Sequence, residues 1–302
     1  MGKDFSEAEK KLRKLISNSK FIFEGQSYQA GKADKPKVQG SGGETKTDAY
    51  FIAKNHRGNE KEFKISYKKE NFSFLENKLT KKNALDLYGP GWSDIIREQI
   101  SGLEKEFSKR ILFYEEKKGR VYPGSICLGW RNEIAIHPRT LCVIPKQDIA
   151  ERVLSNKNRR SKLRDGTVGG KIIPGSGVPN YFIKMKLEDI KSVNDIFENL
   201  KSIEDAVKGL DLYSVFIAHN YDPINDKQHG GDSRSLAVSV DWKTVNGKIE
   251  ADLIFDKQLE INSNDQADKI KEIIQSVGLK IGQGFARSKF KKKLSPNVIT
   301  FP

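Results

Sequence analysis

The sequence predicts a mixed α/β fold, because segments with helical periodicity alternate along the chain with segments typical of strands. The chain has 302 residues, of which 36% are hydrophobic and 31% are charged. This length is enough to bury one large core or two modest ones. The two clearest elements are a helix over 92–116, with apolar residues at helical spacing, and a hairpin over 236–255, with an Asn-Gly turn between two alternating runs.

The first part of the chain is expected to contain a helix and then a hairpin. Residues 5–18 predict a short amphipathic helix, and residues 48–54 and 60–68 alternate well enough to be strands. The five residues between these strands, 55–59, have turn chemistry, so an antiparallel hairpin is expected. Residues 71–88 are expected to be helical, up to a Gly-Pro-Gly sequence that ends the run.

The rest of the chain predicts shorter elements of both kinds. One stretch differs from the others: residues 156–179 are rich in glycine, arginine and lysine with little periodicity, which predicts a long basic loop. The other expected elements are strands near 125–129, 133–137, 141–144, 181–186 and 212–218, and helices at 146–155, 187–209 and 266–277.

The charge balance favours a polyanionic partner. The chain carries 54 basic and 40 acidic residues, a net charge of +14. Such an excess destabilises a compact state unless a ligand such as a phosphate backbone neutralises it. The alternative explanation for part of this excess is a lysine-rich composition of the kind that many soluble proteins from AT-rich genomes have.

Several other function classes are not expected. No segment approaches the roughly 18 apolar residues of a membrane span, and the N-terminus lacks the apolar core of a secretory signal. Cys127 and Cys142 form no CxxC pair, which favours free thiols in a reducing compartment. Without a membrane span or a secretory signal, the protein is expected to be cytoplasmic. No GxxxxGK[ST] sequence for phosphate binding is present, and we expect no small-molecule cofactor.

The predicted hairpin over 48–68 carries the residues that metal-dependent phosphodiester hydrolysis needs. Asp48 stands at the start of its first strand, and Glu62-Phe63-Lys64 lies on the second. Mg²⁺ is usually bound by one or two carboxylates together with waters and phosphate oxygens. A nearby lysine can orient the attacking water and stabilise negative charge. We therefore expect Asp48 and Glu62 to bind Mg²⁺ and Lys64 to activate water.

The register of this hairpin stays open. Folding about residues 55–56 brings Asp48 close to Glu62, whereas folding about 57–58 brings it opposite residues 66–68. Ser66 and Lys68 are then the second pair of candidates, because they share the strand face of Glu62 and Lys64. A solvated charged face is the alternative to any catalytic role.

The sequences GGETKTDAYF at 42–51 and EFKISYKKE at 62–70 resemble the active-site region of PD-(D/E)xK nucleases, specifically type II restriction endonucleases. Asp48 matches the aspartate of the motif, Glu62 its second acidic position and Lys64 its lysine. Thr47 stands where the family has proline. The resemblance implies a mixed central β-sheet flanked by helices, Mg²⁺-dependent cleavage of double-stranded DNA that leaves 5′-phosphate ends, and a homodimer.

On this interpretation, residues 1–150 form the nuclease core with its catalytic hairpin, and residues 151–302 add hairpin elements for DNA recognition or dimerisation. The sequence shows no sharp linker between them, so one continuous domain stays an alternative. Two other functions stay open: a basic DNA-binding protein without catalysis, and a nuclease of the same fold that recognises DNA structure. Phosphate contacts need positive charge. The residues expected to contact DNA are the basic side chains of the glycine-rich loop: Lys157, Arg159, Arg160, Lys162, Arg164 and Lys171.

Overall fold

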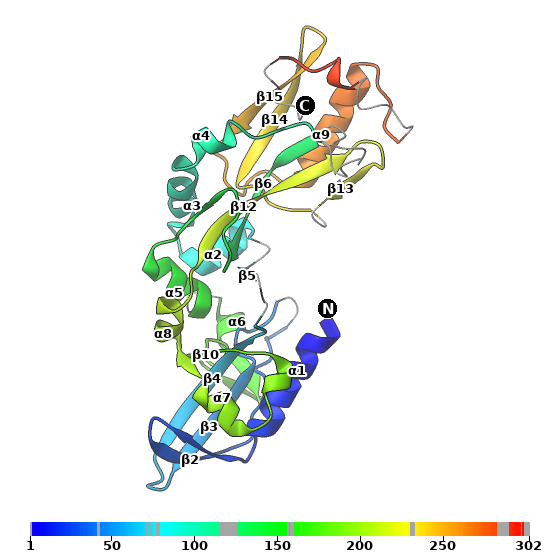
Figure 1. Cartoon of the computed structure of the whole chain (residues 1–302). Helices are drawn as coiled ribbons and strands as arrows, with labels where there is room; N and C mark the ends of the chain where they lie inside the picture. The colour runs from blue at the N-terminus through cyan, green and yellow to red at the C-terminus, as the bar shows by residue number, and fades with distance from the viewer. Residues whose placement is uncertain are drawn as a thin grey trace. The chain divides into compact units, whose positions relative to one another are not determined.

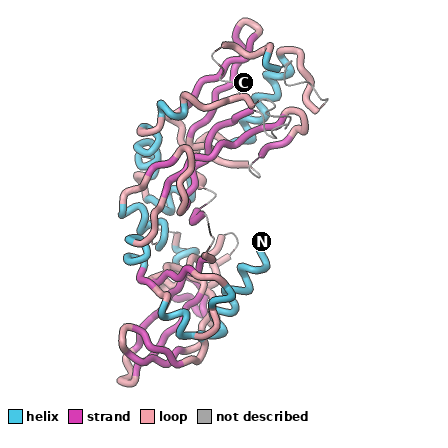
Figure 2. The backbone as a smooth tube through the Cα atoms, in the orientation of Figure 1, coloured by secondary structure: helices cyan, strands magenta, loops and turns pink. Residues whose placement is uncertain are grey.

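The chain forms two compact units, each built from segments that are far apart in the sequence (Figures 1 and 2). The first unit contains residues 1–75, 86–89 and 145–212, and the second contains residues 76–85, 90–144 and 213–302. The expected division near residue 150 is therefore corrected, because residues 145–212 pack with the N-terminal segment. This computed structural model describes residues 2–40, 43–70, 72, 74–76, 79–114, 126–155, 157, 160–229, 233–282, 290–296 and 298.

The first unit is organised around a mixed six-stranded sheet in the order β1-β2-β3-β4-β10-β11. All neighbouring strands are antiparallel except β4 and β10, which are parallel. The parallel pair arises because the chain leaves the sheet after β4 and returns much later along its edge. The strands are β1 (Lys20–Phe23), β2 (Gln26–Ala30), β3 (Ala49–Asn55), β4 (Glu60–Lys68), β10 (Tyr181–Lys184) and β11 (Lys201–Ser202).

Period-two alternation along β4 separates a hydrophobic face from a charged one. Phe63 and Ile65 are fully buried, and the Phe63 ring stacks on that of Phe51 with ring centroids 4.9 Å apart. The intervening residues, among them Lys64 and Ser66, therefore point to the other face of the sheet. The face that carries the candidate residues is the one turned away from the aromatic core.

Helices flank this sheet, so the expected class, a mixed α/β fold with a mixed sheet flanked by helices, is confirmed. Leu12 and Ile16 of α1 are buried in the same core as Phe51 and Phe63. The helical elements of the unit are α1 (Gly2–Ile16), α5 (Gln147–Ser155), α6 (Ser161–Arg164), η1 (Leu187–Asp189), α7 (Val193–Glu198) and α8 (Ile203–Lys208). A small hairpin, β8 (Gly166–Val168) and β9 (Lys171–Ile173), completes it.

The second unit contains an antiparallel sheet in the order β13-β12-β6-β14-β15. Ile270 and Ile274 of α9 are fully buried, and α9 packs against β14 and β6. The sheet strands are β6 (Ile126–Ala135), β12 (Tyr213–Asp222), β13 (Lys227–His229), β14 (Val238–Val245) and β15 (Lys248–Ile254), and the helices are α3 (Trp92–Ser101), α4 (Glu104–Phe107) and α9 (Ser263–Ser276). The remaining elements of the chain are β5 (Phe74–Glu76), α2 (Lys81–Tyr88) and β7 (Cys142–Val143).

Both predicted hairpins are confirmed. In the later one, Asn246 and Gly247 take positive φ values of 49° and 72°, as a tight turn between β14 and β15 requires. The N-terminal helix, the helix at 146–155 and the helix at 266–277 also form, within a few residues of the expected limits. In the described part of the chain, no helix is long and apolar enough to cross a membrane.

Several long elements are shorter than predicted, each for a local reason. The helix expected over 92–116 is two helices separated by Gly102, a poor helix former, and α4 ends at Phe107. Helix α2 begins only at Lys81, not near residue 71. Conversely, the two strands expected at 125–129 and 133–137 are the single strand β6.

The helix expected over 187–209 and the basic loop expected over 156–179 are also corrected. Ser192 and Ser202 each accept a hydrogen bond from a backbone N–H three residues ahead, so α7 and α8 start as separate helices. The basic segment contains α6 and the β8–β9 hairpin, which turns at Gly169 and Gly170 with φ values of 56° and 82°. From residue 160 onward this segment is therefore folded.

Substitution of Gly129 by alanine should destabilise the second unit strongly. A Cβ atom at this position would lie 2.3 Å from the Val238 carbonyl oxygen and 2.9 Å from the Ser239 Cα, and φ is 144°. We expect a loss of about 3 kcal/mol or more in the free energy of unfolding, measured with urea. Gly91→Ala, where a Cβ meets nothing within 4 Å, is the control and should change it by under about 1 kcal/mol. Equal losses would contradict the close approach of β6 and β14.

Candidate active site

The β3–β4 hairpin turns at residues 55–59, and one side chain fixes the turn. The Asn55 carboxamide oxygen accepts hydrogen bonds from the N–H groups of Arg57 and Asn59, at 3.0 and 2.9 Å. Gly58 takes a left-handed φ of 81°, which glycine adopts without strain. The hairpin is therefore centred on Arg57.

This register places Asp48 beside Ser66 and not beside Glu62. The N–H of Asp48 donates to the Ile65 carbonyl oxygen at 2.8 Å, and the Asp48 Oδ2 accepts from the N–H of Tyr67, also at 2.8 Å. Asp48 thus makes the last two hydrogen bonds between the two strands, one through its backbone N–H and one through its carboxylate. Of the two registers that the sequence left open, the second is observed.

Glu62 and Lys64 form a local ion pair away from Asp48. Glu62 pairs with Ile52, which lies four residues further along β3 than Asp48, or about 13 Å at strand spacing. Because Mg²⁺ binds its oxygen ligands at about 2.0–2.1 Å, one ion cannot contact both carboxylates, and the expected Asp48–Glu62 pair is corrected. Lys64 Nζ lies 2.9 Å from Glu62 Oε2. Burial, and then a hydrogen bond to Glu62, raise the pKa of the Tyr50 hydroxyl to about 12.

The second carboxylate at Asp48 comes from α1. Lys35 Nζ lies 2.7 Å from Glu9 Oε2 and 3.5 Å from Asp48 Oδ1, so one ammonium bridges two acidic side chains. Glu9 and Asp48 are each only 7% exposed. Lys35 is placed there because Asp34, next to it, exchanges two backbone hydrogen bonds with Tyr50 of β3.

Sequence reasoning missed both Glu9 and Lys35. Glu9 stands on the expected amphipathic helix, directly after Ala8 and three residues before Leu12, which are both fully buried. The sequence did contain one signal for Glu9: an acidic residue at the edge of an apolar helix face is expected to be partly buried. Nothing in the sequence connects it with Asp48, because the connection is made only when α1 packs on the sheet.

Burial and charge set the protonation of Asp48. Burial is the main reason why the pKa of its carboxyl group rises to about 6, and the negative charge of Glu9 adds to the rise. The positive charges of Lys35 and Lys68 and the Tyr67 N–H oppose it. Burial also works against the Lys35 ammonium, but the Glu9 hydrogen bond and the nearby carboxylates raise the pKa of Lys35 above its ordinary value. The site stabilises positive charge between two carboxylates.

The donor set at this position fits a hard divalent cation of the Mg²⁺ type. Such an ion needs one or two carboxylates and takes its remaining ligands from water and substrate oxygens. Asp48 and Glu9 supply two carboxylates, and the Lys35 ammonium stands where a cation would balance them. Within the described residues, no group of three or more His, Cys, Asp or Glu side chains is arranged to hold a metal ion.

Ser66 and Lys68 complete the neighbourhood. Ser66 is 3% exposed and lies opposite Asp48, and Lys68 follows two residues later on the same strand face. The charge of Lys68 acts on the Asp48 carboxylate. The register therefore brings together Asp48, Ser66 and Lys68 and leaves out Glu62 and Lys64.

The basic residues expected to contact DNA have different surroundings. Arg160 Nε lies 2.7 Å from Asp86 Oδ2, and Arg164 makes two hydrogen bonds to Asp165. These two arginines therefore already have carboxylate partners within the fold. Of the others, Lys157 and Lys171 are exposed, Lys162 is partly buried, and Arg159 lies outside the described residues. Contact between these side chains and DNA stays a prediction.

No family model matches the chain, and no curated protein matches it. Among solved structures, the chain is similar to the restriction endonuclease MspI in complex with its cognate DNA. The sequence identity is 14% and the TM-score is 0.27. The alignment covers 68% of this chain and 64% of the endonuclease chain, so it spans less than two thirds of that protein. A likeness this distant assigns neither a family nor any site residue.

Replacement of Asp48 by asparagine should stabilise the protein at pH 8. The folded-state pKa of about 6 lies above the ordinary value of 3.8, so the folded protein holds the proton more tightly than the unfolded chain. Stability contributed by the protonated group is present below about pH 4 and is lost as pH rises through about 6. We therefore expect Asp48→Asn to gain about 1–3 kcal/mol at pH 8 and much less at pH 4.5, measured by urea unfolding.

Glu62→Gln serves as the matched control, because the Glu62 side chain is 39% exposed. It should change stability by under about 0.5 kcal/mol at either pH. An Asp48→Asn variant that is destabilised equally at pH 8 and pH 4.5 would show that Asp48 is not held in an unfavourable charged state.

Proposed function

We propose that this protein is a Mg²⁺-dependent endonuclease of the restriction type, which cuts double-stranded DNA at specific sequences and leaves 5′-phosphate ends. The observation that carries the proposal is the convergence of two buried carboxylates, Asp48 and Glu9, with the lysines Lys35 and Lys68 at the start of β3. The net charge of +14 and the resemblance of residues 42–51 to the nuclease motif support the same function.

Asp48 and Glu9 would hold the metal ion. A bound Mg²⁺ supplies Lewis acidity, which stabilises negative charge on the phosphate and on the leaving oxygen. Ser66 occupies the place opposite Asp48 where the motif has its second acidic residue, so Glu9 takes over that charge from α1. Glu62 and Lys64, which match the motif in sequence, are then part of the scaffold.

Lys68 is the residue that we assign to the water. Hydrolysis forms a bond between the water oxygen and phosphorus and breaks the bond from phosphorus to the 3′ oxygen, which leaves as a 3′ hydroxyl. An ammonium can orient the attacking water by hydrogen bonding and stabilise the extra negative charge on the phosphoryl oxygens. Lys68 is half-buried on the same face of β4 as Ser66, and its charge acts on the Asp48 carboxylate. A homodimer would present two such sites, one for each strand of a palindromic sequence.

Incubation of the full chain with unmethylated phage DNA, with Mg²⁺ or with EDTA, tests the proposed activity. Discrete bands that appear only with Mg²⁺ are expected. A Mg²⁺-dependent smear would instead indicate a nonspecific nuclease or one that recognises DNA structure. Intact DNA whose mobility nevertheless shifts would identify a binding protein without catalysis.

Two matched pairs of substitutions separate the observed site from the sequence motif. Lys68→Met should reduce the cleavage rate by about 100-fold or more, because the lysine that positions water is lost. Lys64→Met removes the same charge two positions earlier on the strand and should stay within about threefold of the wild type. Likewise, Glu9→Gln should abolish cleavage and Glu62→Gln should not. The reverse pattern in single-turnover assays would restore Glu62 and Lys64 as the catalytic residues.

A further inference from the structure

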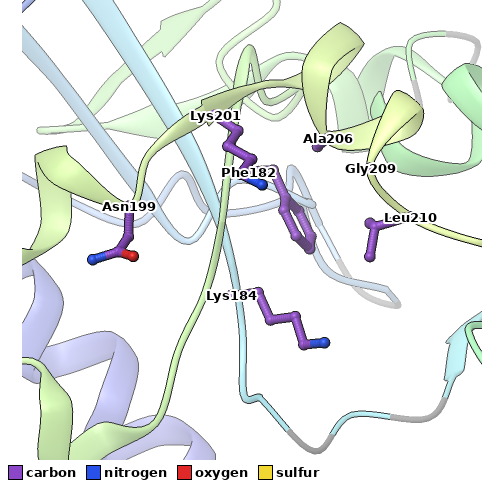
Figure 3. A pocket seen from close by; sticks show the side chains of 7 residues that line it. All are labelled: Phe182, Lys184, Asn199, Lys201, Ala206, Gly209 and Leu210. Carbon is purple, nitrogen blue, oxygen red and sulfur yellow. The ribbon is translucent and has the colours of Figure 1, made fainter.

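A pocket opens on the first unit, between β10, β11 and α8. Phe182 and Lys184 project into it from β10, Lys201 comes from β11, and Leu210 closes it after α8 (Figure 3). In Figure 3 the Phe182 ring and the Lys184 side chain extend from β10 to the same side, toward Leu210. The pocket thus combines an apolar floor with two cationic side chains.

This pocket lies on the same sheet face as Ser66 and Lys68. In the parallel β4–β10 pair, Phe182 is the partner of Ser66 and Lys184 is the partner of Lys68. Phe182 is in turn the partner of Lys201 in β11. Since paired residues point to the same side of a sheet and neighbouring strands are about 4.8 Å apart, the pocket begins one strand away from the candidate active site.

Within the part of the chain that the structure describes, neither lysine of the pocket has an acidic partner. Among the described residues, no carboxylate forms an ion pair with Lys184 or Lys201, whereas Lys208 of the adjacent α8 pairs with Glu204 at 2.9 Å. Lys184 Nζ lies 5.8 Å from the centroid of the Phe72 ring. Two exposed ammonium groups without carboxylates, beside a hollow, are an electrostatic site for an anion.

We propose that this pocket binds a backbone phosphate of the DNA strand, one or two nucleotides from the phosphate that is cut. The assignment rests on the proposed function, because it takes the position beside Lys68 as the place of cleavage. Phosphates of one strand advance about 3.4 Å per nucleotide along the duplex axis, so a neighbouring phosphate reaches the adjacent β-strand. Lys184 and Lys201 then fix the register of the strand on the site without reading its sequence.

The first measurement is the salt dependence of duplex DNA binding by the full chain, followed by fluorescence anisotropy in EDTA so that no cleavage occurs. In Lys184→Met/Lys201→Met, the slope of log K against log salt should fall by about 0.9 for each lost phosphate contact. The control is Lys54→Met/Lys191→Met, which removes two exposed charges elsewhere on the same unit and should leave the slope unchanged. Equal slopes in the two double variants would overturn the proposal, as would a wild-type protein that does not bind DNA.

A second measurement identifies the phosphate. Duplexes with a single neutral methylphosphonate linkage, placed at successive positions, should lose affinity for the wild type at one position near the cut site. That loss should disappear in the Lys184→Met/Lys201→Met variant. If no position behaves in this way, and inorganic phosphate alone shifts the lysine NMR signals of the pocket, the pocket binds a free anion and the DNA assignment is wrong.

The two proposals fail in different ways. Intact DNA in the presence of Mg²⁺, together with the expected change of slope in the pocket variant, would remove the nuclease function and keep the phosphate site. Mg²⁺-dependent cleavage by the wild type, together with an unchanged salt slope in the pocket variant, would keep the nuclease function and remove the phosphate site. Both pocket lysines are exposed, so the variants should unfold at the same urea concentration as the wild type.

Discussion

The candidate site depends on the hydrogen bonds by which Asp48 ends the β3–β4 ladder. Its N–H and its carboxylate are both directed at β4, each at 2.8 Å. Because Asn55 fixes the turn at the other end of the hairpin, the aspartate cannot move along β4 without losing both bonds. The carboxylate is thus held at the one place where α1 presents Glu9 and the preceding loop presents Lys35. The hydrogen bonds of the hairpin therefore hold the Asp48 carboxylate beside Glu9 and Lys35 without a metal ion.

This geometry is electrostatically unfavourable without a cation. Two carboxylates that are each 7% exposed repel one another and have lost most of their hydration. Lys35 relieves part of this cost and carries the charge that a metal ion would carry. The ammonium also lies 3.7 Å from Glu44, whose side chain is 83% exposed. Glu44 is therefore a third carboxylate within reach of the Lys35 ammonium, besides Glu9 and Asp48.

The sequence predicted the fold class and both hairpins, but it could not decide the register that places Asp48. Pairing Asp48 with Glu62 or with Ser66 differs by four residues, and an even shift leaves the alternation of buried and exposed residues unchanged. The side chain of Asn55 and the left-handed Gly58 fix the observed register, and neither the hydrogen bonds of Asn55 nor the φ value of Gly58 can be read from the composition. Glu9 was missed for a different reason: it reaches the site through the packing of α1, and no local pattern encodes that contact.

Glu62 and Lys64 lie on β4 at the edge where the chain returns to the sheet as β10. Without β10, one edge of β4 would be an open row of N–H and C=O groups. Asn180 closes this edge first: its side chain accepts from the N–H of Lys64 and donates to the carbonyl of Glu62, at 2.8 and 3.0 Å. The contact of the returning chain with β4 therefore begins at Asn180, and β10 continues it along residues 65–68. The other half of β4 pairs with β10 itself, so that Lys184 lies beside Lys68 on the face of the sheet where we propose contact with a phosphate backbone.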